Sequence, residues 1–300
     1  MQGVTSSTLV PPKMEKIYDM HIHLWSGGAP ESLIERLEAA GIYGGAVFSE
    51  PPRQMLMGHS AGGEERLVQV LSFCRKFPDR LFPVLWVHPD EEGTLPLIKT
   101  AAAEGIRGFK IICNNFYVHE NKSMEMLYCI AEAGIPALFH SGILWTPGVS
   151  GEFNRPLNWE RLIEIPSLRF SMAHCSWPWY DECLALYGKF LFLSGQKDFS
   201  SEMYLDLTPG TPPSYRRDLL TKLLTSGYDI DRHILYGIDC DAGNYRVEWA
   251  QKWLKIDNEI FDDLGLEPQQ KERIFSGNTL RFFGISGEGY RYRPTTYDGS

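Results

Sequence analysis

The chain has 300 residues, 43% of them hydrophobic and 22% charged, which is typical of a soluble globular protein with a core of ordinary size. The formal net charge is −9, and this acidic balance argues against a nucleic-acid-binding surface, which would be basic. The first sixteen residues contain no apolar run long enough for a signal peptide or a membrane span, so we expect no membrane partner.

Short apolar segments alternate with longer amphipathic segments along the chain. Strands are predicted over eight of the short segments: 16–22, 44–49, 81–87, 106–112, 135–140, 168–174, 189–195 and 233–239. Helices are predicted between them, and several end in glycine, the usual residue after a helix C-terminus: 29–41, 63–77, 94–105, 123–134, 158–165, 179–188 and 215–227. A long amphipathic helix follows over 244–264, and a second helical segment over 268–284.

This alternation, with nearly continuous apolar strands, indicates a parallel sheet. Eight such units in about 250 residues predict an α/β fold of the (β/α)8 TIM barrel type. We expect one domain over 1–300, with its core at about 15–285 and polar tails at both ends. A doubly wound open sheet is the alternative, but the G-x-G-x-x-G motif that usually follows its first strand is absent.

The first predicted strand ends in the sequence KIYDMHIHLW, which places His21 and His23 two positions apart. Residues i and i+2 of a strand point to the same side, so both imidazoles face one direction. Histidine is a very common metal ligand, and this pair is a candidate half of a metal site.

Further titratable residues lie at the ends of other predicted strands. Lys110 is in the fourth, His140 closes the fifth, His174 the sixth and Asp239 the eighth. The C-terminal ends of barrel strands meet at one mouth, so we expect these side chains to share a pocket. Long loops over 143–158 and 196–214 should lie on the same face.

Imidazoles together with a carboxylate form a nitrogen and oxygen site that suits one divalent ion, Zn²⁺ first, and also Mn²⁺, Fe²⁺ or Co²⁺. Such an ion lowers the pKa of a bound water to about 7. We therefore expect His21, His23 and His140 to be ligands and Asp239 to be both ligand and base. His174 would polarise a carbonyl group or donate a proton.

Four segments, DMHIHLW, FHSG, AHCSWPW and LYGIDCD, resemble the strand-end motifs of the amidohydrolase superfamily. The segments FPDRLFPVLWVHPDE, GIRGFKI and ERIFSGNTLRFFGI are similar to the amidohydrolase-2 branch, which includes the aminocarboxymuconate-semialdehyde decarboxylase-like enzymes. The resemblance spans about 16–285 and implies a barrel of the metal-dependent hydrolase type. It implies metal ligation by His21, His23, His140 and Asp239, with His174 as the unligated catalytic histidine.

The sequence departs from the branch in two places. KIICNN follows the fourth strand, where the branch often has a His–Pro pair, and GIDCD replaces G-S-D-x-P in the eighth. Asp241 is therefore a rival carboxylate, although Asp239 matches the motif by position. Lys110 is either carboxylated, as in other branches, so that it bridges two metal ions, or an ammonium that binds an anionic substrate group, and we favour the ammonium.

Other residues near the predicted strand ends complete the expected pocket. Trp25, Trp145 and Trp177 follow strand ends and would line an aromatic pocket, and Arg53 is a candidate clamp for a carboxylate. We expect His88 to be structural and His59, His119 and His233 to be surface or loop residues.

Two reactions fit these residues. The first is hydrolysis of an amide, ester or lactone bond by a metal-activated water. The alternative is non-oxidative decarboxylation of an unsaturated or aromatic acid, and a third interpretation is a catalytically idle barrel used for binding. The expected partner is a small molecule, a carboxylate or planar aromatic acid. No cysteine pair has C-x-x-C spacing, and we expect a cytoplasmic location with reduced thiols. The helix at 244–260 is a candidate contact for a homodimer.

Overall fold

The computed structural model describes residues 16–55 and 61–285, and in it every strand pairs in parallel with its neighbours. The sheet order is β8-β7-β6-β5-β4-β3-β2-β1-β9. The strands are β1 (Tyr18–His23), β2 (Gly44–Phe48), β3 (Leu81–Trp86), β4 (Gly108–Ile111), β5 (Ala137–Phe139), β6 (Arg169–Met172), β7 (Glu202–Asp206), β8 (Ile234–Leu235) and β9 (Cys240–Asp241).

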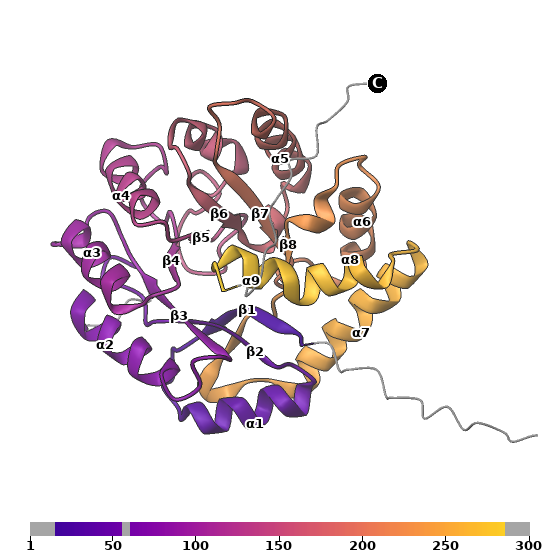
Figure 1. Ribbon diagram of the computed structural model, residues 1–300, viewed down its shortest axis with the longest axis horizontal. Helices are drawn as coiled ribbons and strands as arrows, with labels where there is room; N and C mark the ends of the chain where they lie inside the picture. Colours follow the sequence, from indigo (N-terminus) through magenta and orange to yellow (C-terminus); the bar gives the residue numbers. More distant parts are fainter. Residues whose placement is uncertain (1–15, 56–60, 286–300) are drawn as a thin grey trace, which may run out of the picture.

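Helices surround the sheet on its outer side, as Figure 1 shows. They are α1 (Pro30–Ala40), α2 (Gly63–Cys74), α3 (Thr94–Glu104), α4 (Asn121–Glu132), the 3-10 helix η1 (Pro156–Glu164), α5 (Tyr180–Ser194), α6 (Pro213–Leu224) and α7 (Val247–Asp263). The last helical segment comprises α8 (Pro268–Glu272), the π-helical turn η5 (Arg273–Gly277) and α9 (Asn278–Phe282). Short 3-10 turns are η2 (Ala173–Ser176), η3 (Ile230–Arg232) and η4 (Ala242–Asn244).

The first and last strands meet and close the sheet into a barrel. The segment from β8 to β9 pairs with β7 at its start, through Ile234, and with β1 at its end, through Cys240 and Asp241. Between these points the carboxylate of Asp19 accepts hydrogen bonds from the Ile238 amide at 2.9 Å and from the Tyr245 hydroxyl at 2.8 Å. The eighth strand is thus divided in two, and the predicted (β/α)8 barrel is confirmed.

Two large apolar clusters stabilise this architecture. The larger fills the layer between strands and helices, and the smaller fills the barrel interior with residues such as Met20 and Phe82. Phe282 and Phe283 of the C-terminal helical segment join the interior cluster, and Figure 1 shows α9 lying across the barrel. The segment therefore covers the end at which the strands begin, and the other end stays open for a site.

The seventh strand was predicted in the wrong place. Residues 189–194 continue helix α5 beyond Gly188, and the true strand is β7, which was expected to be loop. A short apolar run such as KFLFL suits a buried strand or one face of a helix equally well, and its length alone cannot decide. Gly188 lies inside the helix, and a Cβ there would be 2.4 Å from the Tyr228 hydroxyl oxygen, so close packing accounts for this glycine.

Two further expectations concern histidines away from the mouth. His88 is buried as expected, and its Nε2 lies 3.1 and 3.2 Å from the side-chain oxygens of Asn114 and Asn115. His233 was expected at the surface but is buried, with its Nδ1 2.9 Å from the Tyr187 hydroxyl. His59 lies outside the described residues.

None of the helices in the described ranges combines the length and apolar character needed to cross a membrane. Helix α7 buries Ala250, Trp253, Ile260 and Phe261, so its tryptophan-bearing face packs on its own barrel.

Candidate active site

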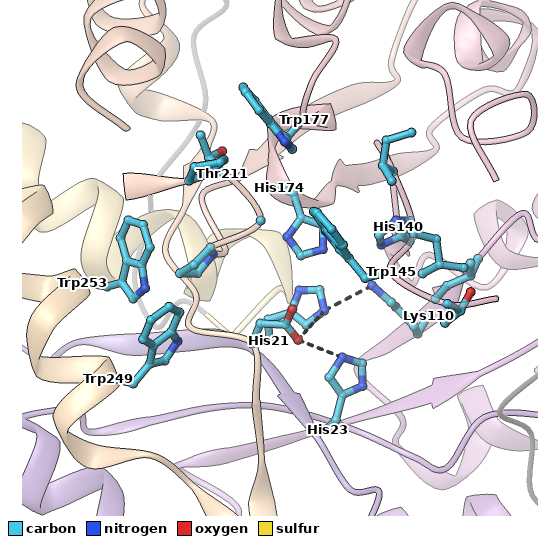
Figure 2. A pocket seen from close by; sticks show the side chains of 18 of the residues that line it. His21, His23, Lys110, His140, Trp145, His174, Trp177, Thr211, Trp249 and Trp253 are labelled. Carbon is cyan, nitrogen blue, oxygen red and sulfur yellow. Dashed lines mark hydrogen bonds and ion pairs between the residues drawn. The ribbon is translucent and has the colours of Figure 1, made fainter. Parts of the chain in front are cut away.

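A cavity of about 410 Å³ lies at the C-terminal ends of the strands. Most of the predicted site residues line it: His21, His23, Trp25, Lys110, His140, Trp145, His174, Trp177 and Asp239. Figure 2 shows the histidines and Lys110 grouped together, with Trp249 and Trp253 on another side. Arg53 is exposed and is not among the lining residues, so the structure does not bring it to this cavity.

The spacing of His21 and His23 has the predicted effect. Both side chains line the cavity, and both rings approach Asp239. Oδ1 of Asp239 is 3.3 Å from Nε2 of His23 and 3.8 Å from Nε2 of His21. Asp239 lies between β8 and β9 with a φ of 61°, a left-handed conformation that aspartate tolerates better than most residues.

Burial and charge set the protonation of these groups. Burial lowers the pKa of His21 to about 3 and also lowers the pKa of His23 and of His140. Burial opposes ionisation of Asp239, but the neighbouring His21 and His23 hold the pKa of its carboxyl well below the ordinary value. The cluster therefore presents neutral imidazoles and a carboxylate, which are the forms that bind metal ions.

The donor atoms fit a divalent ion. One ligand atom each from His21, His174 and Asp239 lies within 4.8 Å of the others. Among the described residues, Nε2 of His140 has no hydrogen-bond partner although it is buried. A buried nitrogen without a partner is costly, and a metal ion would satisfy it. His174 lies closer to this group than expected for a histidine that does not bind the ion.

Backbone strain places His174. It follows β6 with a φ of 57°, and the next two residues are also left-handed. A Cβ at Gly210 would lie 2.8–2.9 Å from three atoms of the His174 side chain, so only glycine fits there. The Nδ1 of His174 donates to the carbonyl oxygen of Thr208 at 3.2 Å, which leaves Nε2 for the cavity.

Two polar residues of the site were missed by the sequence analysis. Asp206, at the end of β7, accepts a hydrogen bond at 2.9 Å from Nδ1 of His21, and Thr208 follows it. The sequence feature that could have identified Asp206 is a carboxylate at the C-terminal end of an apolar strand, as at Asp239. It was lost because strand seven was predicted over 189–195.

Lys110 is buried in β4, with its ammonium 3.4 Å from Nε2 of His21. Burial lowers its pKa to about 8, while the carboxylates of Asp206 and Asp239 oppose the shift.

Aromatic side chains form much of the remaining wall. Trp25 stacks on His23 with ring centroids 4.0 Å apart, and Trp177 packs on Tyr215 at 4.9 Å. Trp145 also lines the cavity, although its side chain is 80% exposed. Trp86, Trp249 and Trp253 also line the cavity and were not predicted to do so.

The rival carboxylate Asp241 has a different place. Its oxygens accept hydrogen bonds from the amides of Trp25 at 3.0 Å and Ser26 at 3.2 Å, and from the Ser26 hydroxyl. It therefore ties down the loop after β1 and is not a lining residue, whereas Asp239 is.

The family model described as amidohydrolase matches residues 18–285. No curated protein matches the sequence.

Several solved structures share the fold at low sequence identity. A probable 2-pyrone-4,6-dicarboxylic acid hydrolase from Acinetobacter baumannii, solved with citric acid, is 13% identical with a TM-score of 0.60, covering 90% of this chain and 99% of its own. Dihydroorotase from Campylobacter jejuni is 16% identical with a TM-score of 0.56, covering 91% and 85%. Amidohydrolase 2 from Bifidobacterium longum subsp. infantis is 15% identical with a TM-score of 0.54, covering 90% and 99%.

Proposed function

This chain belongs to the amidohydrolase family, in its amidohydrolase-2 branch, and from that premise we propose that it is a metal-dependent hydrolase of an amide, ester or lactone bond. The observation that carries the proposal is the convergence of buried neutral imidazoles and an ionised carboxylate at one end of an aromatic cavity. Membership of this family indicates an enzyme, and these residue types indicate that it would hold a metal ion.

We assign one divalent ion, Zn²⁺ first, to His21, His23, His140 and Asp239. Nitrogen and oxygen donors of this kind suit Zn²⁺ and accept Mn²⁺, Fe²⁺ or Co²⁺. When bound, such an ion polarises a carbonyl oxygen and lowers the pKa of water.

The remaining roles belong to the side chains. The carboxylate of Asp239 accepts the proton of the attacking water, because the neighbouring His21 and His23 hold its pKa well below the ordinary value, against the effect of burial. Nε2 of His174 faces the cavity, where it polarises the carbonyl group or passes a proton to the leaving group. The Lys110 ammonium pairs with a carboxylate of the substrate. The flat faces of the substrate are covered by Trp25, Trp145 and Trp177.

A planar carboxylated molecule suits this lining. The structural relatives named as a 2-pyrone-4,6-dicarboxylic acid hydrolase and a dihydroorotase support this substrate class as a proposal, since they share the fold. A carboxylated lactone is therefore the first class of compound to test.

Non-oxidative decarboxylation is the second candidate. The observation that favours it is the buried Lys110 ammonium beside an aromatic wall, which would hold a planar anion. In that reaction the bond from the ring or alkene carbon to the carboxylate breaks, carbon dioxide leaves, and the carbon takes a proton from a protein acid.

We also propose a cytoplasmic location and a homodimer. The six cysteines are buried and unbonded, which supports a reducing compartment such as the cytoplasm. A homodimer contact through α7 would use the exposed face of this helix, because its buried face packs on its own barrel.

The test combines elemental analysis with two product assays on zinc-loaded protein. One assay measures acid release from a panel of carboxylated lactones, and the other measures carbon dioxide release from the matching unsaturated and aromatic acids. We expect about one metal ion per chain, its loss in His140→Ala, and acid release without carbon dioxide. Carbon dioxide alone would favour the decarboxylase, and absence of metal under every loading condition would leave a binding barrel.

A further inference from the structure

The segment from Asp206 to Thr208 at the end of β7 contacts two histidines of the site that come from different strands. His21 belongs to β1, and His174 follows β6. Asp206 and Thr208 are both buried, at 2% and 0% exposure, so no solvent weakens these contacts.

Both oxygens of the Asp206 carboxylate accept hydrogen bonds. One oxygen accepts the hydrogen bond from Nδ1 of His21 at 2.9 Å. The other accepts the Thr208 amide at 2.6 Å and the Thr208 hydroxyl. A carboxylate can only accept here, so Nδ1 of His21 carries the proton and Nε2 presents its lone pair to the cavity.

The main chain of Thr208 fixes the tautomer of His174 in the same way. Its carbonyl oxygen lies 3.2 Å from Nδ1 of His174 and can only accept a hydrogen bond. In its neutral form His174 therefore also carries its proton on Nδ1 and directs the Nε2 lone pair into the cavity.

Close packing holds the segment itself in place. A Cβ at Gly237 would lie 2.5 Å from the Thr208 hydroxyl oxygen and 3.3 Å from the carboxylate of Asp206. The thiol of Cys175 donates to the carbonyl oxygen of Asp206 at 3.4 Å. Neighbouring strand ends thus fix the segment from both sides.

We propose that Asp206 and Thr208 are a single positioning unit that sets the tautomer and ring orientation of His21 and His174 together. The inference rests on the proposed metal site and adds residues that no comparison assigns to it. A carboxylate behind a metal-binding histidine raises the basicity of the ligand and fixes its ring, and removing such partners typically costs 10–100-fold in metal affinity.

The experiment uses full-length protein labelled with ¹⁵N-histidine, whose Nδ1 and Nε2 signals report the tautomer of each ring. The signals of His21 and His174 are assigned with His21→Ala and His174→Ala. In metal-free wild type we expect both rings to be protonated on Nδ1. Protonation of either neutral ring on Nε2 would overturn the proposal without the need for any further variant.

Zinc affinity, measured by competition with a chelator, is the second readout. We expect Asp206→Asn to bind Zn²⁺ about 10–100-fold more weakly and to alter the His21 tautomer, because the two Thr208 donors keep the amide oxygen and the NH2 group then faces Nδ1 of His21. Thr208→Val should disturb His21 less and leave the His174 tautomer intact, because its carbonyl group is kept. Unchanged affinity and tautomer in Asp206→Asn would contradict the proposal.

Matched controls separate positioning from general loss of stability. Asp231→Asn removes a buried carboxylate that pairs with Arg273 away from the cavity, and Thr279→Val removes a buried hydroxyl. Both should keep wild-type zinc affinity and tautomers. If wild type binds no zinc the proposed function fails, while the tautomers still decide this inference.

Discussion

Nζ of Lys110 lies 3.4 Å from Nε2 of His21, the same nitrogen that faces Oδ1 of Asp239 at 3.8 Å. An ammonium group can only donate, so it engages the lone pair that a metal ion needs. The ammonium and the proposed divalent ion would therefore compete for one imidazole nitrogen.

Replacing Lys110 tests this competition. We expect Lys110→Met to bind zinc about tenfold more tightly and to keep about one ion per chain, while a carboxylated substrate binds at least about tenfold more weakly, roughly 1.4 kcal/mol. Chelator competition and elemental analysis check the metal, and KM checks the substrate. A fall from two ions per chain would instead mean a carboxylated lysine bridging two metal ions.

Asp239, which precedes β9, and Asp241, which lies in β9, should respond differently to substitution. Asp239→Asn should lose most of its zinc and about 10²–10⁴-fold in turnover, since it removes both a ligand and the base. Asp241→Asn should keep the metal, because Asp241 binds the amides of the loop after β1. Elemental analysis of both proteins measures the difference, and equal loss in the two variants would argue against this assignment.

His174 tests the boundary between ligand and catalyst. We expect His174→Ala to retain its zinc and to lose about 10²–10⁴-fold in turnover, as for removal of a general acid or polarising group. Metal content and kcat are measured on the same preparation. Loss of the ion would place His174 among the ligands, together with His21 and Asp239 in the group of close donor atoms.

Gly210 leaves room for the His174 ring, so a methyl group there should displace it. We expect Gly210→Ala to fold, with unchanged circular dichroism, and to lose at least about tenfold in kcat/KM, since a Cβ would lie 2.8 Å from Cγ of the imidazole. Gly62→Ala is the control, because no atom lies within 4 Å of its added Cβ. Equal activity in the two variants would rule out the steric argument.

His233 makes stability depend on pH away from the site. Burial, reinforced by the charges of Arg281 and Arg232, lowers its pKa to about 3. Between about pH 6.5 and 3 the unfolded chain binds a proton that the folded protein does not, so the stability contributed above pH 6.5 is lost as the pH falls. This group alone contributes a slope of about 1.4 kcal/mol per pH unit.

Urea unfolding of wild type and His233→Gln between pH 7 and 5, with EDTA present, measures this contribution. The variant should be less stable at pH 7 but should have a shallower decline on acidification. Other buried histidines keep part of the slope in both proteins, so the difference between the two slopes is the quantity to compare. Parallel curves would show that His233 does not titrate differently on unfolding.

Most of the site could be predicted because it depends on local patterns repeated at strand ends. The H-x-H spacing places His21 and His23 on one side of β1, and barrel topology brings in His140, His174 and Asp239. Asp206 could not be found while KFLFL was taken for the seventh strand, since an apolar run of that length does not distinguish helix from strand.

The aromatic wall shows a second limit. Trp249 and Trp253 lie in a helix whose amphipathic pattern explains them fully as core residues, yet they line the cavity. Arg53 shows the converse, because its loop position suggested a clamp but its side chain is exposed. Loop conformation depends on tertiary contacts that have no sequence periodicity.

Closure of the barrel also fixes the order in which the site can be assembled during synthesis. The pairing of β1 with β9 brings Asp239 to His23, and β9 leaves the ribosome long after β1. A growing chain that ends before residue 239 has the paired imidazoles but lacks the carboxylate, so the proposed metal site would be incomplete on it. A ligand that binds only the closed barrel stabilises the closed barrel. We therefore expect binding of the proposed metal ion to stabilise the pairing of β1 with β9, which forms last and joins the segments most distant in sequence.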